Sequence, residues 1–163
     1  MILFLKNLLF TIIFPGSVAV YIPLLIVHGR SITSIPRLLG LGMLLLTIGA
    51  AIYLWTVWDF AISGKGTPLP IDAPKCLVVR GLYHYCRNPM YVGVLMVILG
   101  WGALFADGWL LVYACAVGVI VHLFVVFYEE SRLLQLFGDE YESYRRTVDR
   151  WLPRAPKQMT PRP

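Results

Sequence analysis

Four long apolar runs dominate the chain, at about residues 8–27, 35–62, 89–105 and 109–128. An α-helix needs about 20 mostly apolar residues to cross a bilayer. The second run is long enough to cross with tilt, and the third lies near the lower limit. Asp107 and Gly108 separate the last two runs by a tight turn, which predicts a helical hairpin. The pattern predicts an all-α integral membrane fold with four transmembrane helices.

Two polar segments complete the pattern, and together with the runs they form one domain over residues 1–163. The loop 64–88 contains Pro68, Pro70 and Pro74, which exclude a regular helix, and we expect residues 77–79 to be extended. The tail 129–163 carries apolar residues at helical spacing as far as residue 149. It predicts one or two short cytoplasmic helices, interrupted at Gly138 and ended by 151–153.

Composition supports a membrane protein. The chain is 58% hydrophobic and 14% charged, with mean hydropathy +0.72, whereas soluble domains are about 25% charged. The net charge of +5 comes from basic residues placed between and after the apolar runs. The positive-inside rule accounts for that placement, so we expect membrane lipids as partners and no nucleic acid.

Orientation follows from the same basic residues. Lys and Arg precede the third run and fill the tail, which places both segments and both termini in the cytoplasm. Arg30 and Arg37 then fall on the far side, against the rule.

At the N-terminus, Lys6 and the small residues 17–19 are also compatible with a cleaved signal peptide. The apolar run continues to Val27, longer than a signal core, and favours a retained first span.

The three cysteines, Cys76, Cys86 and Cys115, are odd in number and lack metal-ligand spacing. We therefore expect neither a disulfide framework nor a metal site.

The opening of the third run, Arg87-Asn88-Pro89, permits two interpretations. Asn is a good N-cap because its side chain can accept a backbone N–H bond, and Pro is tolerated at the first helical position. The triplet could serve only as that start signal. A helix N-terminus also attracts a carboxylate or phosphate, and Arg87 would add a bidentate partner for a carboxylate.

Two acids, Glu129 and Glu130, end the fourth run. An antiparallel hairpin would bring them to the depth of Asn88, between the aromatic rings of Tyr83 and Tyr91. Such a site could hold a zwitterion that also carries hydroxyl groups. Alternatively, the acids could form surface ion pairs with nearby arginines, which contribute little.

The segments RNPMYVG, YEE, FGDEYESYRRTV and LPR, preceded by GKGTPLP and LVVRGLY, appear in that order over residues 64–154. In this order they resemble the membrane methyltransferases related to isoprenylcysteine carboxyl methyltransferase and phospholipid methyltransferase, in their bacterial branch. The resemblance implies S-adenosylmethionine as cofactor, a lipophilic methyl acceptor taken from the bilayer, and a site at the cytoplasmic face of a bacterial inner membrane.

The resemblance also assigns residues. It implies cofactor binding by Lys75, Cys76, Leu77, Val78, Tyr83, Asn88, Pro89, Met90, Tyr91 and Glu129. Asn88 stands where the family motif has His. Val125 stands where eukaryotic isoprenylcysteine enzymes carry a substrate-linked arginine, which argues against a prenylcysteine carboxylate acceptor.

The chemistry assigns Arg87 and Glu130 as candidate catalytic residues. A carboxylate acceptor needs no base, whereas an amine must lose a proton, to His84 or Glu130. Carboxylate, amine, phenol and thiol acceptors stay open. So do an enzyme acting on a small soluble acceptor and a non-catalytic transporter subunit or scaffold, although a transport path would need more polar residues within the spans.

A few further residues carry predictions of their own. Asp59 is either a functional acid or a solvated group beside the interfacial Trp55 and Trp58. His122 is expected to make a packed, hydrogen-bonded helix contact. Three glycines, at 93, 100 and 102, are expected to permit close helix packing.

Overall fold

The computed structural model describes residues 13–60, 62 and 76–153, and these residues form helices joined by turns and irregular segments. A π-helical turn, η1 (Ser17–Tyr21), leads into α2 (Ile22–Ile26), and α3 follows at Pro36–Asp59. The short 3-10 helix η3 (Gly81–His84) precedes α4 (Pro89–Phe105). The last helices are α5 (Gly108–Phe124), the π-helical η4 (Val125–Glu129) and α6 (Glu130–Thr147).

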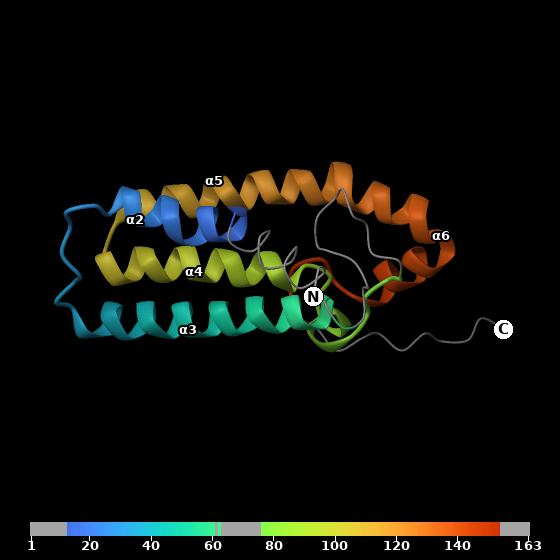
Figure 1. Ribbon diagram of the computed structural model, residues 1–163, viewed down its shortest axis with the longest axis horizontal. Helices are drawn as coiled ribbons and strands as arrows, with labels where there is room; N and C mark the ends of the chain where they lie inside the picture. Colours follow the sequence, from blue (N-terminus) through green and yellow to red (C-terminus); the bar gives the residue numbers. More distant parts are fainter. Residues whose placement is uncertain (1–12, 61, 63–75, 154–163) are drawn as a thin grey trace.

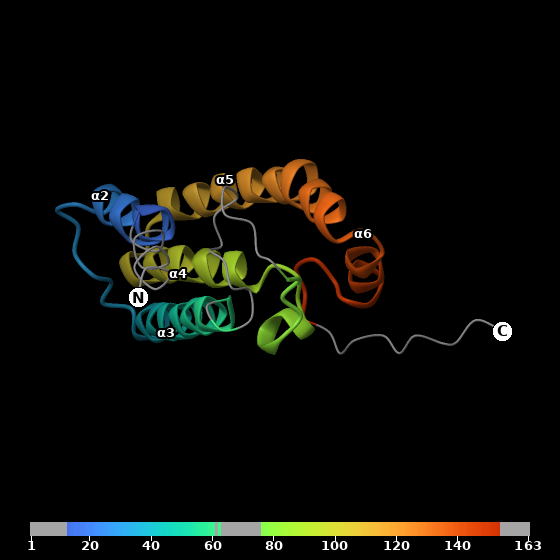
Figure 2. The same cartoon turned by 45° about the vertical axis from the view of Figure 1, so that its right-hand side comes forward.

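Helix α4 lies between α3 and α5, and α2 runs beside α5 (Figure 1). The α2–α3 and α4–α5 connections share one end of the bundle. The opposite end holds the last turn of α3, η3, the start of α4 and α6 (Figure 2). The start of α4 and the end of α5 therefore lie at the same end, as the hairpin predicts.

The turn between α4 and α5 confirms that hairpin. Ala106 adopts the left-handed conformation, with φ of 50°. Asp107 caps α5, because its Oδ1 accepts hydrogen bonds from the backbone N–H of Trp109 at 2.8 Å and of Leu110 at 3.2 Å. Asp107 also forms an ion pair with Arg30. The arginine expected on the far side against the charge rule therefore has an acidic partner there.

Glycines allow α3 and α4 to approach backbone to backbone. A Cβ on Gly49 would lie 2.7 Å from the carbonyl oxygen of Gly93, and one on Gly100 would lie 2.9 Å from the backbone nitrogen of Leu46. The predicted role of Gly93 and Gly100 is confirmed. The prediction for Gly102 is wrong, because a Cβ there would meet only an ordinary contact, at 3.5 Å.

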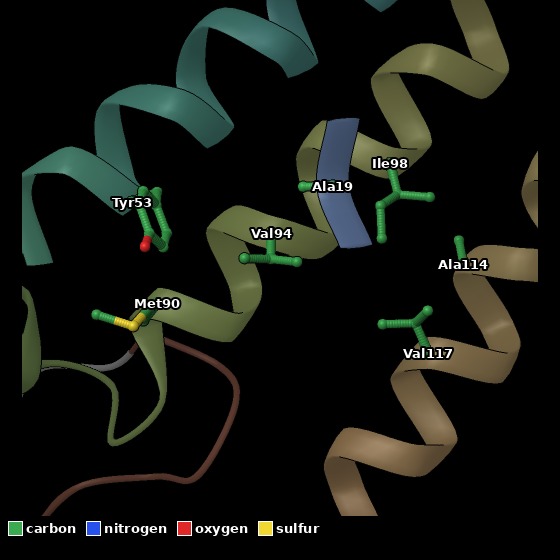
Figure 3. Packing of buried hydrophobic residues seen from close by; sticks show 7 residues of the cluster. All are labelled: Ala19, Tyr53, Met90, Val94, Ile98, Ala114 and Val117. Carbon is green, nitrogen blue, oxygen red and sulfur yellow. The ribbon is translucent and has the colours of Figure 1, made fainter. Parts of the chain in front are cut away.

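The core lies around α4 (Figure 3). Its side chains come from η1, α3, α4 and α5, and Ile98 on α4 is fully buried. The cluster consists of Ala19, Tyr53, Met90, Val94, Ile98, Ala114 and Val117. The core thus packs η1, α3 and α5 against α4.

Two helical stretches are long and apolar enough to cross a membrane, Pro36–Asp59 and Gly108–Thr147. Only 17% and 22% of their most apolar windows are buried inside the protein, which is unlike the core helix of a soluble protein. The shorter apolar helices Ser17–Ile26 and Pro89–Phe105 lie alongside. These exposed apolar faces suit a lipid environment, and four crossings remain a prediction.

The tail differs from its predicted form. Helix α6 does not begin as a separate helix, because α5 and η4 lead into it without a break and the helix is regular as far as Gly138. Tyr128, Glu129 and Glu130 change the polarity of the helix, but they include no helix-breaking residue. The predicted interruption at Gly138 is confirmed by its φ of 50° and ψ of −124°. Helix α6 ends at Thr147, before the predicted stop at 151–153.

Candidate functional site

The start of α4 is built differently from the predicted cap. Pro89 occupies the first turn, but the Asn88 side chain accepts no capping hydrogen bond from the residues that the structure describes. Its Nδ2 instead donates to the carbonyl oxygen of Arg150, at 3.1 Å. The predicted helix start is confirmed, with Asn88 at the N-cap position, but the predicted side-chain capping bond is wrong, because the amide faces a segment that returns from the far end of the sequence. The Asn88 side chain therefore accepts no hydrogen bond from the backbone N–H groups in the first turn of α4.

That returning segment, residues 148–151, lies against the loop before α4. The backbone N–H of Arg87 donates to the carbonyl of Asp149 at 3.0 Å. The Cys86 thiol lies 3.5 Å and 3.3 Å from the carbonyl oxygens of Arg150 and Trp151. The Trp151 indole N–H donates to His122 Nδ1 at 3.2 Å, so the predicted hydrogen bond of His122 is confirmed. The predicted packed helix contact is wrong, because His122 is exposed and Trp151 lies after α6. The segment therefore packs against the residues that lead into α4.

Glu130 is the centre of an ionic cluster. Its Oε1 lies 3.1 Å from Arg87 Nη1 and 2.5 Å from Arg150 Nε, and its Oε2 lies 3.0 Å from Arg150 Nη2. Arg87 Nη1 also donates to the Tyr141 hydroxyl at 3.4 Å. The side chains of Arg87 and Glu130 are each only 11% exposed, so this pair is more buried than the expected surface ion pairs.

The electrostatics of the cluster keep Glu130 ionised. Burial alone would raise its pKa, but the hydrogen bond from Arg150 and the positive charges of Arg87 and Arg150 outweigh burial and lower the pKa. A carboxylate with a lowered pKa and two arginine partners is a poor proton acceptor. The geometry therefore favours Glu130 as a group that positions Arg87.

Glu129 has a different environment. The hydroxyl of Tyr91, in the first turn of α4, donates to Glu129 Oε2 at 3.0 Å. This bond joins the start of α4 to the end of η4. Tyr83 is buried nearby, edge-on to Phe60 with ring centroids 5.7 Å apart. Its carbonyl accepts a 2.6 Å hydrogen bond from the Tyr144 hydroxyl, which ties η3 to α6.

A very small cavity of about 20 Å³ opens between these groups. Its described lining is Arg87, Asn88, Val125, Glu129, Glu130, Leu133, Tyr141 and Tyr144. Arg87 Nε is buried and has no hydrogen-bond partner, although the same guanidinium binds Glu130 through Nη1. A buried, unsatisfied N–H donor favours an anionic ligand. The cavity is smaller than most ligand pockets, which hold about 300–1,000 Å³.

The other predicted site residues that the structure describes do not line this cavity. Leu77 packs against the buried cluster of Tyr141, Tyr144 and Val148, and Val78 is buried. Cys76 is exposed, Pro89 and Met90 are buried, and Met90 belongs to the helix core. His84 is exposed beside Tyr85. Lys75 lies outside the described residues.

The structure thus brings together five predicted residues, Arg87, Asn88, Tyr91, Glu129 and Glu130. It adds Arg150 and Tyr141, which sequence reasoning missed. In the sequence Arg150 is only one of many basic residues expected in the cytoplasm, although the LPR motif of the resemblance begins two positions later, at Leu152. In the described part of the chain, no group of three or more His, Cys, Asp or Glu could hold a metal ion.

These features define a helical membrane protein with a polar site where a helix N-terminus meets the acidic end of its neighbour. The model of the family described as phospholipid methyltransferase matches residues 38–140, and the chain belongs to that family.

Curated relatives share parts of the chain. A protein-S-isoprenylcysteine O-methyltransferase of Schizosaccharomyces pombe is 34% identical over 49% of this chain and 34% of its own length. Methanethiol S-methyltransferase 1 of Bradyrhizobium diazoefficiens is 31% identical over 61% of this chain and 32% of its own. Cobalt-zinc-cadmium resistance protein CzcN of Cupriavidus metallidurans is 31% identical over 73% of this chain and 50% of its own length. The chain spans half or less of the length of these relatives.

Proposed function

We propose that this protein is an S-adenosylmethionine-dependent membrane methyltransferase that acts on a lipophilic acceptor from the bilayer. Family membership and two methyltransferases among the relatives support the reaction class. The observation that carries the proposal is the junction of α4 with η4. There, Tyr91 binds Glu129 beside a cavity that Arg87 also lines, and the buried Nε of Arg87 has no hydrogen-bond partner.

The residues at this junction suit the chemistry of the cofactor. Its carboxylate would fit Arg87 Nε and the N-terminus of α4, where the helix dipole favours negative charge. The Glu129 carboxylate would accept hydrogen bonds from its ammonium or ribose hydroxyls. Because the cavity is smaller than a typical ligand pocket, we expect the loop before α4 or segment 148–151 to move on binding.

When bound, the cofactor supplies a sulfonium methyl group for in-line displacement. Such a reaction depends on alignment, which can supply up to about 7–11 kcal/mol of the barrier. In this proposal Arg87, held by Glu130, orients the donor, and the buried aromatic residues exclude water. Glu130 is a poor base, so an acceptor that already carries an anionic nucleophile, such as a carboxylate, fits this site better than a protonated amine.

Binding of labelled S-adenosylmethionine to the purified full chain tests the donor site. We expect Glu129→Gln to abolish binding. Glu142→Gln is the matched control, because Glu142 also lies on the 108–147 helical stretch but pairs with the exposed Arg145 and Arg146. Retained binding in a folded Glu129→Gln protein, or no binding by the unaltered protein, would overturn the proposal.

The reaction itself is tested with membranes from cells with and without the protein, incubated with methyl-labelled S-adenosylmethionine. Label in an extracted lipid, dependent on Glu129, supports a bilayer acceptor. Label found only in water-soluble compounds would replace the lipophilic acceptor by a soluble one. Cofactor binding with no labelled product in any fraction would favour the non-catalytic alternative.

A further inference from the structure

Arg150 follows the end of α6 and contacts both halves of the candidate site. Its guanidinium binds the two carboxylate oxygens of Glu130, the first residue of α6, at 2.5 Å and 3.0 Å. Its backbone carbonyl accepts the 3.1 Å hydrogen bond from Asn88 Nδ2, directly before α4. Glu130 and Asn88 both line the cavity, whereas Arg150 is absent from its described lining. Any effect of Arg150 on a ligand there must therefore act through these neighbours.

Glu130 has unequal contacts with its two arginines. Arg150 makes two hydrogen bonds to the carboxylate, whereas Arg87 makes one, from Nη1 to Oε1 at 3.1 Å. Arg87 Nε is buried and has no hydrogen-bond partner. A guanidinium can bind a carboxylate through two parallel N–H groups, so without Arg150 we expect Glu130 to turn its second oxygen toward Arg87 Nε. Arg150 thus prevents Glu130 from taking the N–H group that the proposed function assigns to the carboxylate of the methyl donor.

The charges of this cluster support the same role. Arg87 and Arg150 are positive, and the lowered pKa of Glu130 keeps its carboxyl ionised at neutral pH. Arg150 therefore leaves an excess of positive charge beside the cavity. Without it, Arg87 and Glu130 would form a neutral pair, and an incoming carboxylate would be attracted less. The side chains of Arg87 and Glu130 are each 11% exposed, so solvent and salt screen this difference only weakly.

We propose that Arg150 is a positioning residue of the methyl-donor site, which holds the Glu130 carboxylate so that Arg87 Nε stays available to the carboxylate of the donor. This inference rests on the proposed function, which assigns Arg87 to the donor. It requires no contact between Arg150 and the donor. Arg150 therefore contributes only to the part of the donor affinity that comes from the carboxylate. A residue that merely fastened segment 148–151 would affect every part of the bound donor.

Two ligands distinguish these roles. S-adenosylmethionine and decarboxylated S-adenosylmethionine both contain the adenosine, the sulfonium and the amine, and only the former contains the carboxylate. Binding of each to the purified full chain is measured. We expect the unaltered protein to prefer S-adenosylmethionine, and Arg150→Gln to reduce that preference about tenfold, a common scale for coupling between two sites. Binding of the decarboxylated compound should be unchanged. Arg146→Gln is the matched control, because Arg146 on α6 is exposed and pairs with Glu142.

Two further variants test the mechanism and keep it testable if Arg150→Gln alone does not fold. Arg150→Lys retains the positive charge but lacks the planar fork, so it should lose less of the preference than Arg150→Gln. Arg150→Gln combined with Glu130→Gln removes the competing charge, and the new amide oxygen can still accept a hydrogen bond from Arg87 Nη1. This double variant should recover most of the preference. A purely structural Arg150 predicts no recovery, because the double variant loses one more native group.

The outcomes separate this inference from the proposed function. Equal weakening of both ligands in Arg150→Gln, an unchanged preference, or no recovery in the double variant would overturn the positioning role and leave the donor site in place. Equal binding of the two ligands by the unaltered protein would also overturn it, because the carboxylate would then contribute nothing. Binding of neither ligand by the unaltered protein would instead overturn the proposed function.

Discussion

The guanidinium of Arg150 binds both carboxylate oxygens of Glu130, with Nε 2.5 Å from Oε1 and Nη2 3.0 Å from Oε2. The two residues are 20 positions apart, because Glu130 is the first residue of α6 and Arg150 follows the end of this helix. Because Arg87 shares the same carboxylate, one acid holds the segment after α6 against the loop before α4. The docking of the segment after α6 therefore depends on an ionic contact as well as on apolar packing.

Replacing Arg150 by Ala should destabilise the protein by about 1–3 kcal/mol, because a largely buried carboxylate loses two hydrogen bonds. Arg87 remains as a partner, so the lower part of that range is expected. The matched control is Arg146→Ala, whose exposed pair with Glu142 should contribute at most about 0.5 kcal/mol. Thermal unfolding in detergent measures both, and equal effects of the two changes would contradict the role of Arg150.

The contribution of Glu130 should depend on pH. Its pKa is lowered from the ordinary 4.5, so its ionised form stabilises the fold above about pH 4.5, and that contribution is lost as the pH falls through the lowered value. The difference in unfolding temperature between the unaltered protein and Glu130→Gln should be constant from pH 8 to 5 and decrease below that. A difference that grows toward acid pH would show that Glu130 is not held ionised.

Cys86 should report on the docking of segment 148–151. Its thiol is buried, burial raises its pKa, and it faces two backbone carbonyls of that segment. A water-soluble maleimide should therefore label Cys86 far more slowly than the exposed Cys76. Arg150→Ala should accelerate labelling of Cys86 and leave Cys76 unchanged, as mass spectrometry of peptides would show. An unchanged Cys86 rate would mean that the segment stays docked without Arg150.

Gly49→Ala should separate α3 from α4. The added Cβ would lie 2.7 Å from a backbone oxygen of Gly93, so a destabilisation of about 1–3 kcal/mol is expected from overpacking. Gly40→Ala, on the same helix, meets nothing within 4 Å and should change stability by at most about 1 kcal/mol, toward greater stability. Unfolding curves of the two variants compare a closely packed glycine with an open one.

Local features of the fold could be predicted from the sequence because they depend on neighbouring residues. The apolar runs, the Asp107-Gly108 turn and the break at Gly138 each act within a few positions. The close approach at Gly93 and Gly100 also follows from residue size. The sequence did not predict that α5 continues into α6. The change from apolar to polar residues at Glu129 is typical of the end of a membrane span, but it does not alter the preference of the backbone for a helix.

The candidate site was only partly predictable. The antiparallel hairpin is sufficient to bring Tyr91 near Glu129, so that relationship follows from the order of the helices. The hydrogen-bond partner of Asn88 could not be predicted in this way, because its amide contacts a backbone carbonyl 62 residues away. No periodicity in the sequence indicates that contact. The contacts of Glu130 with Arg150 depend on the same return of the chain, so the sequence predicted a catalytic role for Glu130 and not its ionic cluster.

The hydrogen bond between Asn88 and Arg150 has a consequence for biosynthesis. The apolar helices precede residue 148, so they can enter the bilayer while the segment that completes the site is still being translated. Until residues 148–151 have been made, Glu130 can have Arg87 but not Arg150 as its ionic partner. A nascent chain arrested after Thr147 should therefore be integrated in the lipid yet unable to retain the proposed methyl donor.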